Sequence, residues 1–410
     1  MAHPLFRSFG LLAHADYRRM WAIGGLGGGA RWLEFVAVAI YAYELTRSPQ
    51  LVALLSVMRM APYVALGLVV GALADMYDRR RLMLGSLVIM AVVAAVMAVL
   101  TALDLAEYGA VAVATMFSGA FWTIDMPVRR QLMVDAVTKE QMAAGLGLDN
   151  ATMYLTRVVG PLIGGITYAL VGMTGIFTLI CAAYLLCLVL ASRFGGGQPT
   201  VAVAPVAKGG LLGKILPPRE LLTNRRFQVI LGMTTVYNLW CFPFVSMVPV
   251  IAQKDFGLSP FHVGMLAACD GIGGIVGALV VGAAMTERTM FRYHYFGTFA
   301  YVLLIGVMSL HLVVGPTAAL LVLLGVTAAC FSATQYALVY LSAPPEMRGR
   351  ATGMLSLFIG SSLVGFYHTG YLFERLGTVD AMRLMAAEGL IALLFLGAVW
   401  WRIPQQAGGR

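Results

Sequence analysis

Ionisable side chains lie inside long apolar stretches of this 410-residue sequence, where charges are costly to place. They are Arg31, Glu34, Arg59, Asp149, Arg157, Asp270 and Glu388. Each costs roughly 2.5–3.5 kcal/mol at the centre of a bilayer on insertion scales, so such residues are candidates for binding a charged ligand or a proton. We predict that role for the first six and a structural role for Glu388.

The spacing of these charges predicts how they share helix faces. Arg31 and Glu34 are three residues apart, so on a helix they can neutralise each other, either as a static pair or as a pair that lines a cavity. Asp149 and Arg157 follow one stripe of a helix at i and i+8, with Met153 between them. We expect Asp149 to lie near a helix end, solvated or packed against a loop.

Metal, cofactor and catalytic patterns are missing from the sequence. The histidines in or beside apolar runs (His262, His294, His311 and His368) have no metal-ligand spacing, and we expect a packing role for His368. No two of the five cysteines have zinc or redox spacing. There is no Gly-x4-Gly-Lys-Ser/Thr motif for ATP and no Ser/His/Asp cluster. We therefore expect no cofactor, no bound metal and no enzymatic activity.

The composition predicts the elements that must position these charges. The chain is 60% hydrophobic and only 11% charged, whereas a soluble domain carries about 25% charge. Long apolar runs without alternation predict membrane-spanning helices and exclude a β-barrel. The net charge of +9 indicates basic loops at a membrane surface rather than nucleic-acid binding. The predicted fold class is an all-α membrane protein.

The apolar runs predict twelve transmembrane helices in two sets of six. The runs are 20–45, 49–73, 82–102, 109–128, 143–169, 173–193, 227–252, 260–285, 293–313, 316–341, 352–373 and 379–401. The predicted bundles are 1–193 and 227–410, the second with a short tail, joined by a glycine- and proline-rich linker at 194–226. Lys and Arg are concentrated in alternate loops, which places both termini and the linker in the cytoplasm and the chain in the cytoplasmic (inner) membrane.

The loop after the second run has the composition of a conformational latch. It carries Gly71, Asp75, Arg79 and Arg80 between two apolar runs, so a carboxylate and arginines meet at a helix exit. We expect Arg129 and Arg130, in the loop after the fourth run, to be its partners. At a repeat offset of 211 residues, Thr286 replaces the acid, so the latch is predicted on one half only. Two parallel six-span halves are typical of alternating-access transporters.

These motifs resemble those of the major facilitator superfamily. The loop after the second run is similar to that family's Gly-x-x-x-Asp-Arg/Lys-x-Gly-Arg-Arg/Lys motif, with Met76 and Asp78 as departures. Together with Thr46-Arg47-Ser48-Pro49 and Glu346-Met347-Arg348-Gly349-Arg350, it resembles the branch of enterobactin exporters and macrolide-efflux-like proteins. The resemblance implies the pseudo-symmetric fold of that family. It also places the fifth span against the eighth, from which we predict that Arg157 and Asp270 pair in one conformation and separate in another; the alternative partner for Asp270 is a backbone or hydroxyl donor.

The fifth span resembles the antiporter motif of the same family. The matching residues are Gly147, Gly160, Pro161, Gly164 and Gly165, with Thr156 in place of one glycine. The alternative interpretation is ordinary small-residue packing between membrane helices. The arginine often found in the fourth span of proton antiporters is absent from residues 110–123.

We predict secondary active export of an amphipathic small molecule, coupled to protons. Arginines in the first half favour an anionic ligand, an indication that Glu34 and Asp149 offset. Aromatic residues predicted to line the cavity are Trp32, Tyr154, Tyr237, Trp240 and Phe366. The alternatives are a lipid or lysolipid flippase of the same fold, an importer, a membrane-embedded enzyme and a non-transporting sensor. Membrane lipid and protons are the other expected partners.

Overall fold

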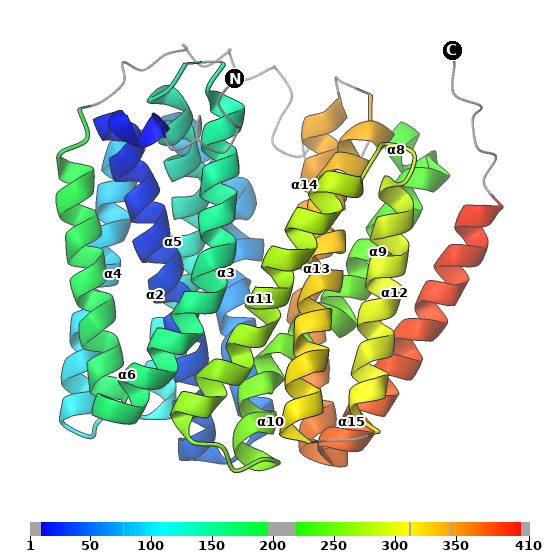
Figure 1. Ribbon diagram of the computed structural model, residues 1–410. Helices are drawn as coiled ribbons and strands as arrows, with labels where there is room; N and C mark the ends of the chain where they lie inside the picture. The colour runs from blue at the N-terminus through cyan, green and yellow to red at the C-terminus, as the bar shows by residue number, and fades with distance from the viewer. Residues whose placement is uncertain are drawn as a thin grey trace. The chain divides into compact units, whose positions relative to one another are not determined.

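The computed structural model describes residues 10–76, 78–138, 140–195, 219–310, 313–344 and 347–402, with only the backbone described at 66–76 and at 219. Within these ranges the chain forms helices and no strand (Figure 1). This confirms the all-α class. Contacts divide the chain into two compact units, the first made of Met1–Ala207 and Val248–Gly271, the second of Lys208–Met247 and Ile272–Arg410.

The first unit is a bundle of long helices with two added segments from later in the chain. Its helices are η1 (Gly10–Ala13), α2 (Ala15–Thr46), α3 (Pro49–Met76), α4 (Arg79–Ala102), α5 (Tyr108–Asp135), α6 (Met142–Ser192), α10 (Val248–Lys254) and the start of α11 (Pro260–Ala284). α6 contains two helices that meet at Gly172, whose positive φ of 63° allows the chain to turn back. The predicted fifth and sixth spans are therefore its two halves.

The ends of these helices follow from short-range capping. The Ser48 hydroxyl caps the start of α3 by accepting a hydrogen bond from the Leu51 N–H at 3.2 Å. Asp78 caps α4 by accepting a bond from the Arg81 N–H at 2.9 Å. Asp78, which departs from the family motif, is thus used to start a helix.

The second unit contains the remaining helices. They are α8 (Arg219–Thr223), α9 (Arg225–Val236), η2 (Tyr237–Cys241), η3 (Phe242–Met247), the rest of α11, α12 (Met290–Met308), α13 (Val314–Ser342), α14 (Arg348–Ile359) and α15 (Ser362–Trp401). A second turn lies inside α15 at Gly377, with φ of 76°. The predicted seventh span is not one regular helix, because it passes through a π-helical and a 3₁₀ segment between α9 and α10.

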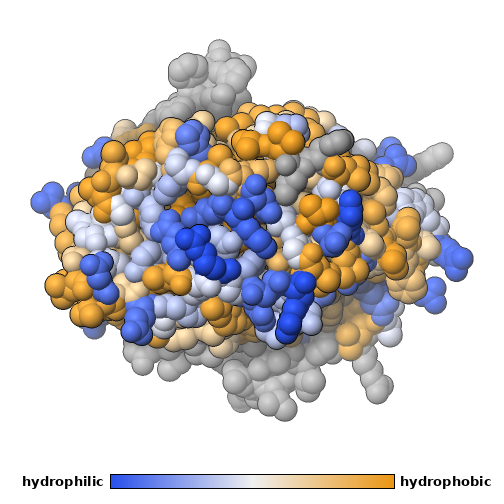
Figure 2. All heavy atoms as spheres, turned by 90° about the horizontal axis from the view of Figure 1, so that it is seen from below, coloured by the Kyte–Doolittle hydropathy of each residue, from blue (hydrophilic) through white to orange (hydrophobic). Residues whose placement is uncertain are grey.

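Length and composition agree with the membrane prediction. Eight helical stretches of the described chain are long and apolar enough to cross a membrane. Two of these stretches turn at Gly172 and Gly377 and so contain two helices each, and α3 and α12 are also of spanning length, which accounts for the twelve predicted spans. On α4, Val88, Val92, Val96 and Val99 lie exposed, as expected for a lipid-facing stripe. Figure 2 shows hydrophobic side chains around the margin of the lower end and hydrophilic ones on the end face.

Candidate functional site

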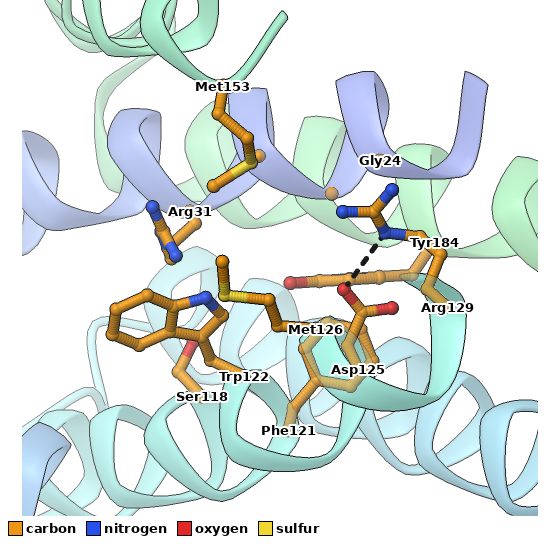
Figure 3. A pocket seen from close by; sticks show the side chains of 12 residues that line it. Gly24, Arg31, Ser118, Phe121, Trp122, Asp125, Met126, Arg129, Met153 and Tyr184 are labelled. Carbon is orange, nitrogen blue, oxygen red and sulfur yellow. Dashed lines mark ion pairs between the residues drawn. The ribbon is translucent and has the colours of Figure 1, made fainter. Parts of the chain in front are cut away.

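A small cavity lies in the first unit between α2, α5 and α6. It has a volume of about 20 Å³ and its lining includes Arg31, Trp122, Asp125 and Arg129. A space of that size holds about one water molecule, so the cavity is a polar site in a closed bundle rather than an open binding chamber. Figure 3 shows the charged and aromatic side chains pointing toward one another from the three helices.

Arg31 projects from α2 into this cavity and rests on an aromatic side chain. Its guanidinium carbon lies 4.0 Å from the ring centroid of Trp122 (Figure 3). The same carbon lies 5.2 Å from the ring centroid of Trp32. A cation over an indole face gains about 2 kcal/mol or more when it is desolvated. No carboxylate lies within ion-pair distance of Arg31 among the described side chains, and Glu34 has other partners. The predicted Arg31 pairing with Glu34 is therefore wrong.

Glu34 instead joins α2 to α3 and α5. It is 3% exposed and accepts a bond from Arg59 NH2 to its Oε1 at 3.4 Å, while the Ser118 hydroxyl donates to its Oε2. Arg31 and Glu34 do not pair because their side chains leave α2 in different directions, Arg31 toward Trp122 and Glu34 toward α3. Three residues of spacing allowed contact but did not require it.

Arg129 is the largest fully buried side chain of the described chain, and it is held by two carboxylates. Its NH1 donates to Asp149 Oδ1 at 2.6 Å, and its Nε lies 3.5 Å from Asp125 Oδ2 (Figure 3). Gly24 of α2 makes room for it, because a Cβ there would lie 2.7 Å from the guanidinium carbon. A buried charge requires such pairing, since an isolated one would cost several kcal/mol.

Asp149 is buried, contrary to the expectation of a solvated or loop-packed acid. It is 1% exposed and also accepts a bond from Arg130 Nε at 3.0 Å. Arg129 and Arg130 are not in a loop, because α5 continues to Asp135 beyond its predicted end at residue 128. Their described partners lie on α5 and α6, in the body of the bundle.

Arg157 and Asp270 form the predicted ion pair. Arg157 NH2 lies 2.5 Å from Asp270 Oδ2, and the Arg157 guanidinium carbon is 5.0 Å from the Trp32 ring centroid. Gly271 permits this contact, since a Cβ there would lie 2.7 Å from the Arg157 backbone oxygen. The pairing is confirmed, and its separation in another conformation stays a prediction.

The glycines of the antiporter-like motif on α6 serve close helix packing. A Cβ at Gly160 would lie 2.6 Å from Trp32 Cβ, and one at Gly164 would lie 3.1 Å from the Leu33 backbone oxygen, both on α2. A Cβ at Gly165 would lie 2.7 Å from the Pro260 backbone oxygen of α11, while Gly147 faces open space. The Pro161 carbonyl likewise faces Gly264 of α11. The small-residue packing is present; a role of the motif in exchange stays a prediction.

Only part of the predicted latch falls on described side chains. Gly71 and Asp75 belong to α3, but their side-chain environment lies outside the described residues. Arg79 NH1 pairs with Asp135 Oδ2 at 3.3 Å, and Arg80 NH2 donates to the Ser192 carbonyl at 2.5 Å. The described arginines therefore connect the start of α4 to the ends of α5 and α6.

The predicted cavity aromatics are distributed over both units. Trp32 lies between Arg31 and Arg157, and Tyr154 is half-buried on α6. In the second unit Tyr237 stacks on Phe331 at 3.8 Å between centroids, Phe366 is buried against Phe242, and Trp240 donates to Glu388. No described residues cluster as His, Cys, Asp or Glu ligands for a metal ion.

Sequence reasoning missed Asp125, Trp122 and Ser118. A usable signal was present: Ser118, Trp122, Asp125 and Arg129 recur at i, i+4, i+7 and i+11, which puts them on one face of α5. Asp125 also lies within the predicted span 109–128 and meets the same criterion as the other intramembrane charges.

The fold and the buried charged site define a polytopic helical membrane transport protein. The chain belongs to the Major Facilitator Superfamily, whose family model matches residues 20–367. This confirms the resemblance found in the sequence motifs.

Curated relatives come from the efflux-type part of that family. The chain is 23% identical over 257 residues to Macrolide efflux protein A of Streptococcus pyogenes, covering 60% of this chain and 61% of the relative. It is 23% identical over 272 residues to the Staphyloferrin A transporter of Staphylococcus aureus, covering 62% and 64%. The chain thus spans about three fifths of the length of these relatives.

Solved structures show the same fold at low identity. A POT family transporter in complex with a thioalcohol-conjugated peptide superimposes with a TM-score of 0.76 at 12% identity, covering 95% of this chain and 96% of that one. A mutant of the nucleoside transporter NupG gives 0.75 at 13% identity, covering 94% and 100%. These likenesses establish the fold alone.

Proposed function

We propose that the protein exports an amphipathic small molecule with an anionic group across the cytoplasmic membrane by alternating access, in exchange for protons. Export is supported by the names of its relatives, one a macrolide efflux protein and one a transporter of staphyloferrin A. Both termini and the linker 194–226 lie on the cytoplasmic side in this proposal, in accordance with the charges of the loops.

The proposal that the substrate has an anionic group rests on the surroundings of Arg31. Arg59, Arg129 and Arg157 each have a carboxylate partner, whereas Arg31 lies over Trp122 with no carboxylate within ion-pair distance among the described side chains. An arginine presents a planar fork of donors that matches a carboxylate or phosphate. The closed cavity has room for about one water molecule, so in this proposal the bundle opens before a ligand's anionic group becomes the partner of Arg31, and Trp122, Met126 and Met153 then contact its apolar part.

The energetics suit export of such a ligand. Moving one negative charge out of a cell that is negative inside is favourable by about 2.3 kcal/mol per 100 mV. Entry of a proton in exchange adds the same electrical contribution and the pH gradient. Both driving forces therefore act in the direction of export.

Transport into inverted proteoliposomes with an imposed pH gradient tests the proposal. Anionic, cationic and lipid-like compounds are compared for the parent protein, for Arg31→Gln and for Arg383→Gln, whose side chain is exposed and outside the cavity. We expect gradient-dependent uptake of anionic compounds, abolished by Arg31→Gln and retained by Arg383→Gln. Asp75→Asn is expected to slow the flux by weakening the latch.

Three results would contradict the proposal. If the flux does not depend on the pH gradient, the protein does not exchange its substrate for protons. If the flux runs in the opposite direction, the protein is an importer. Preferential movement of lipid-like compounds, insensitive to Arg31→Gln, identifies a flippase instead.

A further inference from the structure

A titratable cluster in the second unit is separate from the cavity around Arg31. Glu388 Oε2 accepts a bond from Trp240 Nε1 at 2.7 Å and lies 2.8 Å from His368 Nε2. His368 and Glu388 sit on the two halves of α15, and Trp240 sits on η2. Their side chains are about one third exposed.

Trp240 belongs to the most irregular stretch of the described chain. The backbone changes from α-helix to π-helix at Tyr237–Cys241 and to 3₁₀-helix at Phe242–Met247 before α10 begins. Interruptions of this kind in a membrane helix mark functional sites and hinges. The chain also passes from the second compact unit to the first between Met247 and Val248. A movement of one unit therefore bends the chain in or next to this stretch.

We propose that His368 and Glu388 form a proton-binding pair whose charge is transmitted through the Trp240 indole to the hinge segment 237–247. With the proton bound, imidazolium and carboxylate offset each other, and Glu388 holds the Trp240 N–H weakly. Without it, no imidazolium offsets the carboxylate charge, and the same hydrogen bond becomes stronger because the attraction between the N–H dipole and the carboxylate grows with the net charge of the acceptor. Proton binding thus loosens the hinge.

The elements packed against the pair carry other titratable groups. They are Tyr237 and Cys241 on η2, Arg292, Tyr293, His294, Tyr295 and Tyr301 on α12, Arg225 and Arg226 on α9, and Tyr367, Tyr371, Glu374, Arg375, Asp380 and Arg383 on α15. Tyr237 packs between Phe331 and Tyr301, His294 bonds Thr334, and Asp380 pairs with Arg383. The described ion pairs of the second unit contain no second partner for Glu388. A change of charge at the pair is therefore passed to Trp240.

The location of this pair is consistent with the proposed exchange of an anion for a proton. The consequence of the pair for transport rests on that proposed function. A proton and an anion bound in one cavity attract each other and would travel together. An exchanger of an anion for a proton must keep them apart. Arg31 lies in the first unit and the His368 pair in the second, and Glu34 and Asp270, the acids first considered for the proton, are held by arginines.

The reactivity of the buried Cys241 thiol, which follows Trp240 in the sequence, measures the opening of the hinge segment without a transport assay. Cys241 and Cys187 are both buried, one in the hinge segment and one in the first unit. In proteoliposomes of two single-cysteine proteins, with the other cysteines replaced by serine, maleimide labelling rates are compared between about pH 8 and pH 6, where histidine titrates. The ratio of the Cys241 rate to the Cys187 rate cancels the titration of the thiols themselves.

We expect this ratio to rise several-fold as the pH falls through the histidine range. His368→Gln, Glu388→Gln and Trp240→Phe should each make it independent of pH, the last with the pair intact. A flat ratio in the parent protein overturns the proposal, as does an unchanged pH dependence in Trp240→Phe, a variant that keeps a smaller aromatic ring and lacks the N–H donor. Because no substrate is used, failure here is distinct from failure of the proposed export.

Discussion

The two compact units differ in how their interiors hold polar groups. The first buries ion pairs, with Glu34, Asp149 and Asp270 each bound to an arginine of a neighbouring helix. The second relies on neutral contacts, such as the His294 bond to Thr334 and the stack of Tyr237 on Phe331. The side chains of its described ion pairs are between 31% and 64% exposed. The interior of the first unit is therefore held together largely by paired charges, and that of the second by neutral hydrogen bonds and ring stacking.

The largest expected effect is the loss of a buried acid in the first unit. Asp149→Ala leaves Arg129, which is 1% exposed, with only the longer contact to Asp125. Breaking a buried pair on one side costs about 3–5 kcal/mol. Asp380→Ala, which removes one partner of an exposed pair in the second unit, should cost about 0–1 kcal/mol. Chemical unfolding in detergent measures both, and equal losses would remove the distinction between the units.

A second comparison separates binding from stability among the arginines. Arg31→Gln should weaken binding of an anionic substrate about 10- to 100-fold, as expected for a lost charge-assisted hydrogen bond of roughly 1.5–3 kcal/mol. It should change the free energy of unfolding little, because the loss of the cation–π contact with Trp122, about 2 kcal/mol, is offset by removal of a buried charge that has no acid partner among the described side chains. Arg59→Gln should do the reverse and destabilise the protein, since it leaves Glu34 buried with only Ser118. Calorimetric titration of substrate binding to the two variants tests this prediction. Equal affinities of both variants would exclude Arg31 as the anion site.

The third prediction concerns the helix contacts that hold the charged bundle together. Gly160→Ala places a Cβ 2.6 Å from Trp32 Cβ and should cost about 1–3 kcal/mol through overpacking. Gly147→Ala, in the same motif and the same helix, meets open space and should stabilise by about 0.5–1 kcal/mol. Thermal unfolding of the two variants is the measurement. The changes in stability of the two variants should have opposite signs. The same sign for both would mean that contact with α2 does not determine the effect.

The smallest effect should be equal in both units. Thr298→Val in the second unit and Thr115→Val in the first each remove a buried hydroxyl that donates to a helix carbonyl at 2.8 Å. We expect about 0.5–1.5 kcal/mol for each. If the two losses match in chemical unfolding, the difference between the units arises from their charges. A larger loss in one unit would point to a general difference in packing instead.

The sequence was sufficient for the fold class, the helices and one long-range ion pair. Apolar runs and glycines at the turns fix the spans locally, and the family resemblance placed Arg157 against Asp270. The sequence did not predict the partners of Arg31 and Glu34, because two side chains on one helix face can contact either each other or residues of neighbouring helices. It also failed for Asp149, whose partners Arg129 and Arg130 come from another helix.

The sequence by itself determined that this chain is a bundle of membrane helices of the Major Facilitator Superfamily with charges inside the membrane, because hydrophobicity and glycine placement act over a few turns of one helix. Only the tertiary structure decided which charges are neutralised. A buried arginine is stable where a carboxylate of another helix reaches it, and that depends on how helices distant in sequence pack. The packing leaves Arg31 on Trp122 without an acid partner among the described side chains, and it joins His368 and Trp240 at one carboxylate oxygen.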